Sequence, residues 1–256
     1  MARRKYSNRR RRRGSFGFLY KLLSVIVICV AIVAALTLFF RVDEISVTGQ
    51  LRYTAEEIQA ASGVNLGDNL YLLNKHDIVR NILKELPYIE NIRINRKLPD
   101  TLCIDIRESG RPLALVQGGY AWLVSAGGKI VDQVEESAAG EYGRISGCEL
   151  LAPSVGTSVA LATEYATQQD SLINLLKALE KAEIMDQVDG IRLDNLSYIN
   201  MDYAGRFTVR MAYGADYDWE LTKLEATLAK EEIQSNMTGT IDMLDSEQIF
   251  LYQNVR

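Results

Sequence analysis

The chain has 256 residues, three cysteines and a formal net charge of −4. The charge is divided unevenly, because residues 1–21 hold nine of the 29 Lys and Arg and no Asp or Glu; the rest then carries 20 cations against 33 anions, a net charge of −13. An acidic remainder of this kind argues against a nucleic-acid-binding protein, and so few cysteines exclude a scaffold built on disulfides.

An apolar run follows the basic tail of residues 1–21. Leu22–Phe40 is 19 residues long and uncharged, and as a helix it would span about 28 Å, close to the ~30 Å hydrocarbon core of a bilayer. We therefore expect a transmembrane helix at 22–40, with the basic tail cytoplasmic and residues 41–256 outside by the positive-inside rule. A buried core helix is one alternative. Another is a cleavable signal peptide with a weak cleavage site at Val33-Ala34-Ala35, although its apolar region would be unusually long.

The segment after the apolar run predicts a small α+β unit. A strand at Arg41–Gln50 is followed by a helix that begins with a capping box of Thr54 and Glu57, and by a second helix between Asn74 and Pro87. Two alternating strands, in "ENIRINRKLP" and "DTLCIDIRES", complete the order strand, helix, helix, strand, strand. The economical packing of these elements is two helices on a three-stranded sheet.

The last part of the chain predicts a second domain of mixed α/β type with an extended antiparallel sheet. One helix presents Leu172, Leu175, Leu176, Leu179 and Ala182 on one side, and another is expected at Asp218–Gln234. Residues 150–167 are expected to form a loop. Strands are expected at Leu113–Val116, Tyr120–Val124, Ile130–Val134, Gly190–Leu193, Tyr198–Met201, Arg206–Ala212, Thr240–Leu244 and Gln248–Tyr252.

Motifs for catalysis, metals and cofactors are missing from the sequence. Its single histidine, His76, has no G-x-S-x-G serine elbow to partner it, and no H-E-x-x-H pattern occurs. The stretch "SAGGKI" has Leu123 and Ile130 where a phosphate loop needs Gly and Ser or Thr. We expect no catalytic, cofactor-binding or metal site. A disulfide between Cys103 and Cys148 is left open.

Several stretches in this order resemble the bacterial cell-division protein family FtsQ/DivIB, whose external part begins with a POTRA domain. They are the basic tail and single apolar run, then "VDEISVTGQLRYTAEEI", "GVNLGDNLYLLN" and "LPYIENIRINRKLPDTLCIDIRESGRPLALV". The resemblance implies a POTRA-like domain at 41–110 and a β-rich domain at 111–256. One departure concerns the final strands: Asn236, Met237 and Thr238 precede Gly239 where the family usually has Arg or Lys, and Met243 replaces a Leu.

The resemblance implies a function without catalysis. The chain would be a single-pass type II protein of the bacterial cell membrane and a scaffold of the divisome at the septum. It would bind FtsB/DivIC-like and FtsL-like bitopic partners and support septum formation. Alternatives are a membrane-anchored cell-wall enzyme, another extracytoplasmic binding module, and a eukaryotic type II glycoprotein, which the sequons at Asn195 and Asn236 alone support.

A partner-binding site is expected at the last predicted strand. In "SEQIFLYQNVR" both faces carry apolar or aromatic side chains, and a terminal strand is often a sheet edge with unpaired amides and carbonyls. The candidate residues are Gln248, Phe250, Leu251 and Tyr252. The alternative is that Phe250 and Tyr252 only cover the core. Family resemblance favours docking, since its members are expected to bind their partner near these strands.

Overall fold

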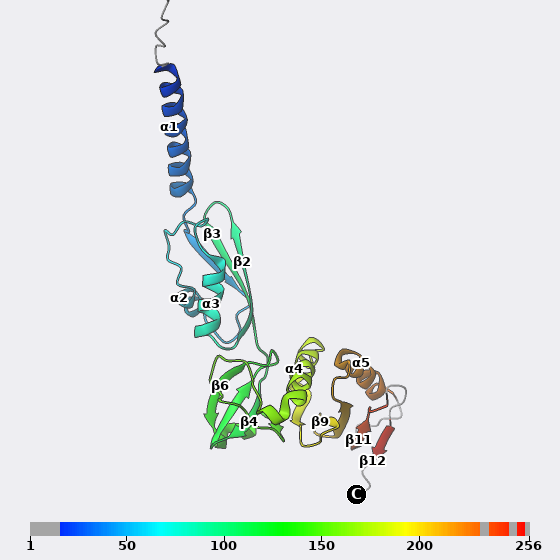
Figure 1. Cartoon of the computed structure of the whole chain (residues 1–256). Coiled ribbons are helices and arrows are strands. Elements are labelled where there is room, and N and C mark those ends of the chain that lie inside the picture. Colours follow the sequence, from blue (N-terminus) through cyan, green and yellow to red (C-terminus); the bar gives the residue numbers. More distant parts are fainter. Residues whose placement is uncertain (1–15, 231–235, 246–249, 254–256) are drawn as a thin grey trace, which may run out of the picture.

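Figure 1 shows the computed structural model of the chain, which describes residues 16–230, 236–245 and 250–253. One long helix stands at the amino-terminal end, a small unit of helices and strands follows it, and a larger sheet with two helices forms the remainder. This arrangement confirms the predicted α+β fold class with an apolar helix first, a small α+β unit next and a large sheet last.

The long helix α1 (Phe16–Phe39) has 24 residues, and all of its described side chains are exposed. Its apolar stretch, Gly17–Thr37, has 21 residues and is long and apolar enough to cross a membrane, because about 1.5 Å per residue gives about 31 Å. The helix begins before the predicted Leu22, since Phe18 and its apolar neighbours extend the pattern and Lys21 lies close enough to the helix end to reach water.

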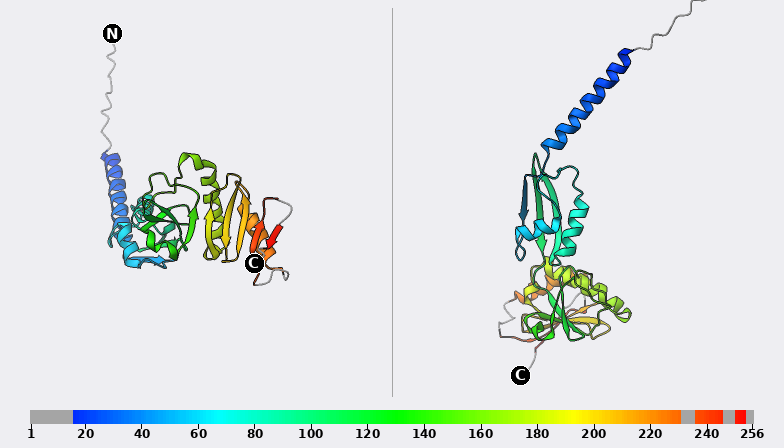
Figure 2. Two further views of the ribbon diagram at one scale, coloured as in Figure 1. Left: turned by 90° about the horizontal axis from the view of Figure 1, so that it is seen from below. Right: turned by 90° about the vertical axis from the view of Figure 1, so that its left-hand side faces the viewer.

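The small unit has the predicted order of elements, and its three strands form one sheet. Its elements are β1 (Glu44–Thr48), α2 (Ala55–Ser62), α3 (Lys75–Glu85), β2 (Ile89–Lys97) and β3 (Thr101–Glu108). Strand β3 lies in the middle, parallel to β1 and antiparallel to β2. Both helices cover one face of this sheet, as the right-hand view of Figure 2 shows.

Local signals in the sequence explain where the two short helices begin and end. The Thr54 hydroxyl accepts from the Glu57 N–H at 3.2 Å, and the Glu57 carboxylate accepts from the Thr54 N–H at 2.8 Å, so the predicted capping box is formed. Gly63 ends α2 with φ of 69°, and Asn74 caps α3. The fully buried residues of the unit include Ile58, Leu70, Ile82, Ile89, Leu102 and Ile104.

The larger unit is built on a nine-stranded sheet in the order β12-β11-β10-β9-β8-β7-β4-β5-β6. Its strands are β4 (Leu113–Gln117), β5 (Tyr120–Val124), β6 (Ile130–Glu135), β7 (Gly143–Ser146), β8 (Val188–Arg192), β9 (Tyr198–Tyr203), β10 (Phe207–Ala212), β11 (Gly239–Asp242) and β12 (Phe250–Gln253). Its helices are α4 (Ala166–Lys181) and α5 (Tyr217–Leu228). The sheet is mixed, because α4 and α5 are crossovers that make β7–β8 and β10–β11 parallel; β4–β7 is parallel too.

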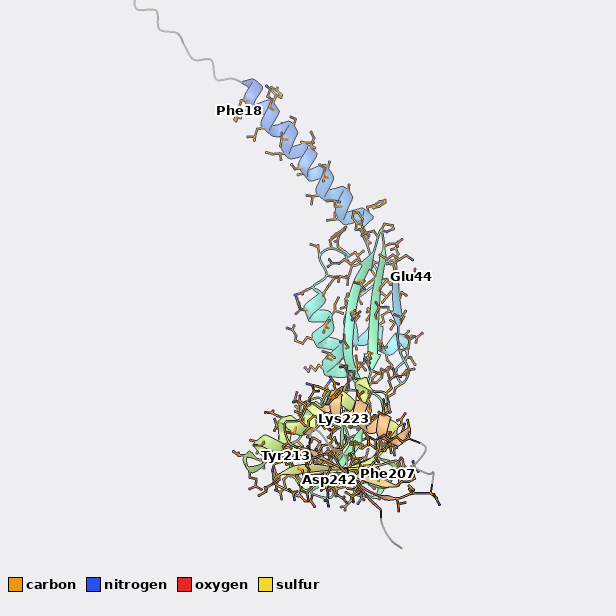
Figure 3. The ribbon with its side chains drawn as sticks, turned by 90° about the vertical axis from the view of Figure 1, so that its right-hand side faces the viewer. Phe18, Glu44, Phe207, Tyr213, Lys223 and Asp242 are labelled. Carbon is orange, nitrogen blue, oxygen red and sulfur yellow. The ribbon has the colours of Figure 1, made fainter. Side chains whose placement is uncertain are left out.

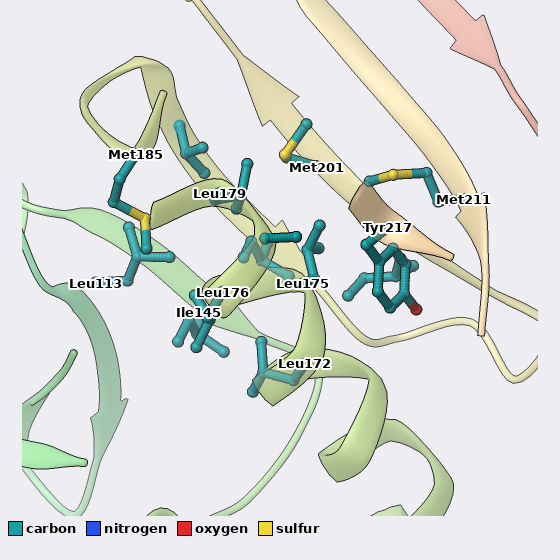
Figure 4. Packing of buried hydrophobic residues seen from close by; sticks show 14 of the residues in the cluster. Leu113, Ile145, Leu172, Leu175, Leu176, Leu179, Met185, Met201, Met211 and Tyr217 are labelled. Atoms are coloured by element: carbon teal, nitrogen blue, oxygen red, sulfur yellow. The ribbon is translucent and has the colours of Figure 1, made fainter. Parts of the chain in front are cut away.

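The core of the larger unit lies between the sheet and its two helices. Four leucines of α4 are fully buried: Leu172, Leu175, Leu176 and Leu179. Figure 4 shows them with Leu113 and Ile145 to one side and Met201, Met211 and Tyr217 to the other. Each buried leucine contributes about 1.5–3 kcal/mol, so this predicted apolar face accounts for much of the unit's stability.

In the large unit, the structure differs from the sequence-based expectation in two elements. Strand β7 was not predicted, because its four residues contain one large apolar side chain and no readable alternation. Its Gly143 lies against the neighbouring backbone, where an added Cβ would be 2.6 Å from the Val188 carbonyl oxygen. Helix α5 ends at Leu228, not at the predicted Gln234, since Leu228 is the last apolar residue of its buried face; residues 231–234 lie outside the described part.

The two units meet at a junction centred on Tyr88, whose side chain is 6% exposed. Its ring packs with Leu123 and other residues of the large sheet, and the Arg52 guanidinium lies 3.9 Å from the ring centroid. The Tyr88 hydroxyl donates to Asp132 Oδ2 at 3.3 Å. Burial raises the pKa of Tyr88 and the Asp132 charge raises it further, so the hydroxyl stays a protonated donor.

Further contacts at the junction join side chains to backbone across the two units. Glu90 Oε1 accepts from the Gly127 N–H at 2.9 Å, and Lys129 Nζ donates to the Leu83 carbonyl at 2.9 Å. Burial lowers the pKa of Lys129 while the nearby Glu90 opposes the shift. The chain passes from β3 to β4 through residues 109–112 with no long linker, and the predicted domain division at residues 110 and 111 stays a prediction.

The three cysteines are free thiols in this structure. Cys29 lies on the exposed surface of α1, Cys103 lies in β3, and Cys148 packs against the core of the large unit. Burial raises the pKa of Cys148 to about 12, so this thiol is protonated and unreactive at neutral pH. The structure contains no disulfide between Cys103 and Cys148.

Candidate partner-docking edge

Strand β12 is the outermost strand of the large sheet at the end away from α1 and the small unit. It pairs only with β11, in antiparallel register: Asp242 is opposite Phe250, Ile241 is opposite Leu251 and Thr240 is opposite Tyr252. Figure 2, left, shows the sheet running from the green strands beside the small unit to the red β12 at the opposite end. The outer backbone groups of β12 have no strand beside them within the described residues.

The opposite edge of the same sheet, strand β6, is partly covered. The Ile130 N–H donates to the Thr157 carbonyl and the Ile130 carbonyl accepts from the Gly156 N–H, both at 2.8 Å. Lys129 and Ser158 form a further bridge. A loop therefore occupies the hydrogen-bonding groups at the start of β6, whereas the described residues put nothing along β12. Of the two edges, β12 is the less covered within the described residues and the better candidate for strand addition.

Strand β11 holds β12 to the rest of the sheet and is itself firmly placed. Ile241 is fully buried, and the Met243 N–H donates to the Arg210 carbonyl at 3.0 Å. The carboxylate of Asp242, whose side chain is only 16% exposed, lies 3.6 Å from the Arg210 guanidinium, which also lies 5.4 Å from the Tyr198 ring centroid. Figure 3 places Asp242 and Phe207 in the sheet and Lys223 on the helix side, with Glu44 and Phe18 far off toward α1.

The predicted docking residues fall partly within the described chain. Phe250, Leu251 and Tyr252 lie in β12, for which the structure describes the backbone and its pairing, and Gln248 lies outside the described residues. The predicted edge position of this strand is found, while the assignment of these residues to a partner stays a prediction. Leu244, directly after β11, is 41% exposed and was not singled out from the sequence, because the strand pattern ends there.

The structure gives no arrangement of side chains for catalysis within the described residues. His76 is exposed at the first turn of α3, and its backbone N–H donates to Asn74 Oδ1. It lines a cavity of about 620 Å³ between α3 and the β5–β6 turn, together with Lys129 and Ser125. That turn contains the glycines of "SAGGK" and closes a hairpin between β5 and β6. No cluster of three metal-ligating side chains is found in the described part of the chain.

The comparisons with known proteins agree with this architecture. Residues 40–109 match the family model of the POTRA domain, FtsQ-type. The cell division protein FtsQ of Syntrophotalea carbinolica is 29% identical over 227 residues, which is 86% of this chain and 77% of that protein. The cell division protein DivIB of Clostridium botulinum strain Hall is 24% identical over 230 residues, 87% of each chain. FtsQ of Geotalea daltonii is 25% identical over 224 residues, 84% of this chain and 76% of that one.

The small α+β unit is therefore a POTRA domain of the FtsQ type, as its sheet order and the matched residues both indicate. The similarity to division proteins extends through the large sheet as well, over most of the chain. Over most of its length the chain is similar to the bacterial cell-division proteins FtsQ and DivIB, as its sequence motifs predict. Helix α1 and this similarity fit a single-pass membrane protein with a role in division.

Proposed function

We propose that this chain is a non-enzymatic bitopic scaffold of the divisome, which binds FtsB/DivIC-like and FtsL-like partners and supports septum formation. The FtsQ-type POTRA domain and the similarity to FtsQ and DivIB proteins support this role. The open edge of β12 carries the proposal, because a scaffold needs a surface that accepts another chain. Its partners would be bitopic proteins that lie in the same membrane and reach the large unit from beside α1.

Docking would occur by strand addition to β12. An added strand would complete the hydrogen bonds of the outer β12 backbone, which supplies affinity without sequence-specific contacts. Specificity would come from side chains at the positions of Phe250 and Tyr252, which stand opposite the partly buried Asp242 and Thr240 in register. Leu251 stands opposite the buried Ile241, and we expect it to serve the core instead.

Replacing Phe250 or Tyr252 by alanine is expected to weaken partner binding by about tenfold or more, because an aromatic anchor at an interface centre contributes about 2 kcal/mol or more. The melting temperature should change little. The measurement is capture of the purified partner ectodomains by the full chain in detergent, together with a thermal melt of each variant. Full binding by both variants would contradict docking at β12, and collapse of the fold would favour the core role of these residues.

A matched control for Tyr252→Ala is Tyr120→Ala. Tyr120 lies in β5 of the same sheet, is 47% exposed and stands between two paired strands. Its substitution removes an exposed aromatic side chain from a strand that is paired on both sides, so the β12 edge is left unchanged. Equal loss of binding in Tyr120→Ala and Tyr252→Ala would show a general effect on the sheet and would count against a local docking site.

The basic tail is expected to be cytoplasmic, which places residues 41–256 outside. The nine cations and no acid of residues 1–21 support this orientation by the positive-inside rule. Protease added to cells stripped of their wall should remove the external part and spare the tail; lysed cells are the control, in which both are cut. A tail that is degraded in intact cells would reverse the orientation and remove the large sheet from the cell exterior.

A further inference from the structure

The loop between α2 and α3, residues 64–74, lies against the end of α1. The Leu70 N–H donates to the Phe40 carbonyl at 2.8 Å, and Asn69 Nδ2 donates to the Thr37 carbonyl at 3.3 Å. Two more backbone bonds join the loop to the chain just after α1. The loop is therefore fixed to α1 at the end of its apolar stretch. The loop must then lie at the same depth in the membrane as the end of α1.

Three large apolar side chains of this loop are exposed: Leu66 by 62%, Tyr71 by 51% and Leu72 by 78%. Leu70, between them, is fully buried in the core of the POTRA domain, so the loop is ordered and the other three are left outside that core. A cluster of exposed apolar residues on one loop marks a contact surface. A cavity of about 260 Å³ joins the loop to the helix and is lined by Val33, Leu36, Thr37, Asn69, Tyr71 and Leu72.

The residues of α1 that line this cavity indicate how deep it lies in the hydrocarbon core of the membrane. The apolar stretch of α1 ends at Thr37, and Val33 lies four residues further in, which is about 6 Å at ~1.5 Å per residue. Leu72 lines the same cavity as Val33. Apolar faces of proteins that lie in a membrane interface are buried by about 5–10 Å, so this depth fits insertion of a loop.

Aromatic side chains mark the level of the interface. The rings of Phe40 and Tyr71 meet edge to face with centroids 5.0 Å apart, and Phe39 lies 5.4 Å from Phe40. Tyrosine and other aromatic residues concentrate where the hydrocarbon meets the headgroups. Tyr71 thus lies at the depth where α1 leaves the hydrocarbon core. Leu72, the next residue, lines the cavity beside Val33 of the helix.

We propose that the loop at 64–74 inserts Tyr71 and Leu72 into the leaflet in which α1 ends, as a second membrane contact of the POTRA domain. The inference rests on the proposed membrane anchoring by α1. The occupant is lipid acyl chain, because the cavity is continuous with the apolar surface of α1 at Val33 and Leu36, and no described part of the chain covers that surface. The domain is then held against the bilayer at two places.

The test places a tryptophan at Leu72 in the full chain, in phosphatidylcholine vesicles with bromine on the acyl chains near the headgroup. The matched control is Leu51→Trp, since Leu51 is 88% exposed in the same domain but lies at the junction with the large unit. Trp122 and Trp219 give the same background in every variant. The added fluorescence of Leu72→Trp is expected to fall about twofold relative to Leu51→Trp and to shift to the blue.

A third variant separates this inference from the membrane anchor itself. Val30→Trp, in the middle of α1, reports whether the helix spans the bilayer, and vesicles brominated deep in the acyl chains should quench it. Quenched Val30→Trp with Leu72→Trp equal to Leu51→Trp overturns the loop insertion and leaves the anchor standing. Unquenched Val30→Trp overturns both. Quenching of Leu72→Trp that changes when the protein is diluted in lipid assigns the surface to a second copy and overturns the lipid contact.

Discussion

Replacing Tyr88 by alanine is expected to lower the free energy of unfolding by about 3–5 kcal/mol, because it removes a buried aromatic ring and leaves a cavity. Tyr88 is the residue of the POTRA domain that packs into the large sheet, so its loss should also separate the melting of the two units. Calorimetry of the full chain in detergent is expected to show one transition for the unchanged protein and two for Tyr88→Ala.

The matched variant Tyr88→Phe keeps the ring and removes only the hydroxyl that donates to Asp132. It should cost about 1 kcal/mol and preserve the single transition, because one hydrogen bond has a modest net contribution. If both variants lose the same stability, the hydrogen bond dominates and the ring packing does not. If Tyr88→Ala still melts in a single unshifted transition, the junction does not couple the two units.

Replacing Glu108 by alanine is expected to destabilise the POTRA domain by about 2–4 kcal/mol. The Glu108 side chain lies at the end of β3 in a residue that is 6% exposed. Its carboxylate accepts from the backbone N–H groups of Leu51 at 3.0 Å, Arg52 at 2.8 Å and Tyr53 at 3.2 Å. A charged acceptor makes stronger hydrogen bonds than a neutral one, and alanine leaves all three donors without it. Thermal and denaturant unfolding measure the loss.

Two further variants make the Glu108 result interpretable. Glu108→Gln keeps the size of the side chain and one accepting oxygen, so its loss should fall between those of the parent chain and Glu108→Ala. Glu56→Ala, at an exposed position of α2, should change stability by only about 0.5 kcal/mol. A loss for Glu108→Ala as small as that of Glu56→Ala would mean that water replaces the carboxylate at the three amides.

The small unit could be predicted because its signals are local. The Thr54 and Glu57 pair, Asn74 and Pro87 each act within one turn of helix, and the alternating strands need only their own residues to be read. The junction carries no such signal. Tyr88 and Asp132 are 44 positions apart, and nothing near either residue specifies the other.

The large sheet and its docking edge could be predicted only in part. The last strand was expected from its own apolar pattern, but its place at the edge comes from the pairing order of the whole sheet. Strand β7 was missed because its place depends on close approach of Gly143 to the Val188 backbone, a contact between distant segments. Sheet edges and strand pairings depend on contacts between distant segments, whereas helix caps and apolar periodicity can be recognised in the local sequence.

Because no flexible linker separates α1 from the POTRA domain, motion of the helix is transmitted to the rest of the chain. Phe40 is hydrogen-bonded to the POTRA domain, and that domain is locked to the large sheet through Tyr88, Glu90 and Lys129. The part of the chain that follows α1 is thus expected to move as one body with this helix. When α1 turns about its own axis, β12 sweeps an arc at the far end of the sheet. A neighbouring transmembrane helix that packs against α1 would therefore set the orientation of β12 without contacting this strand.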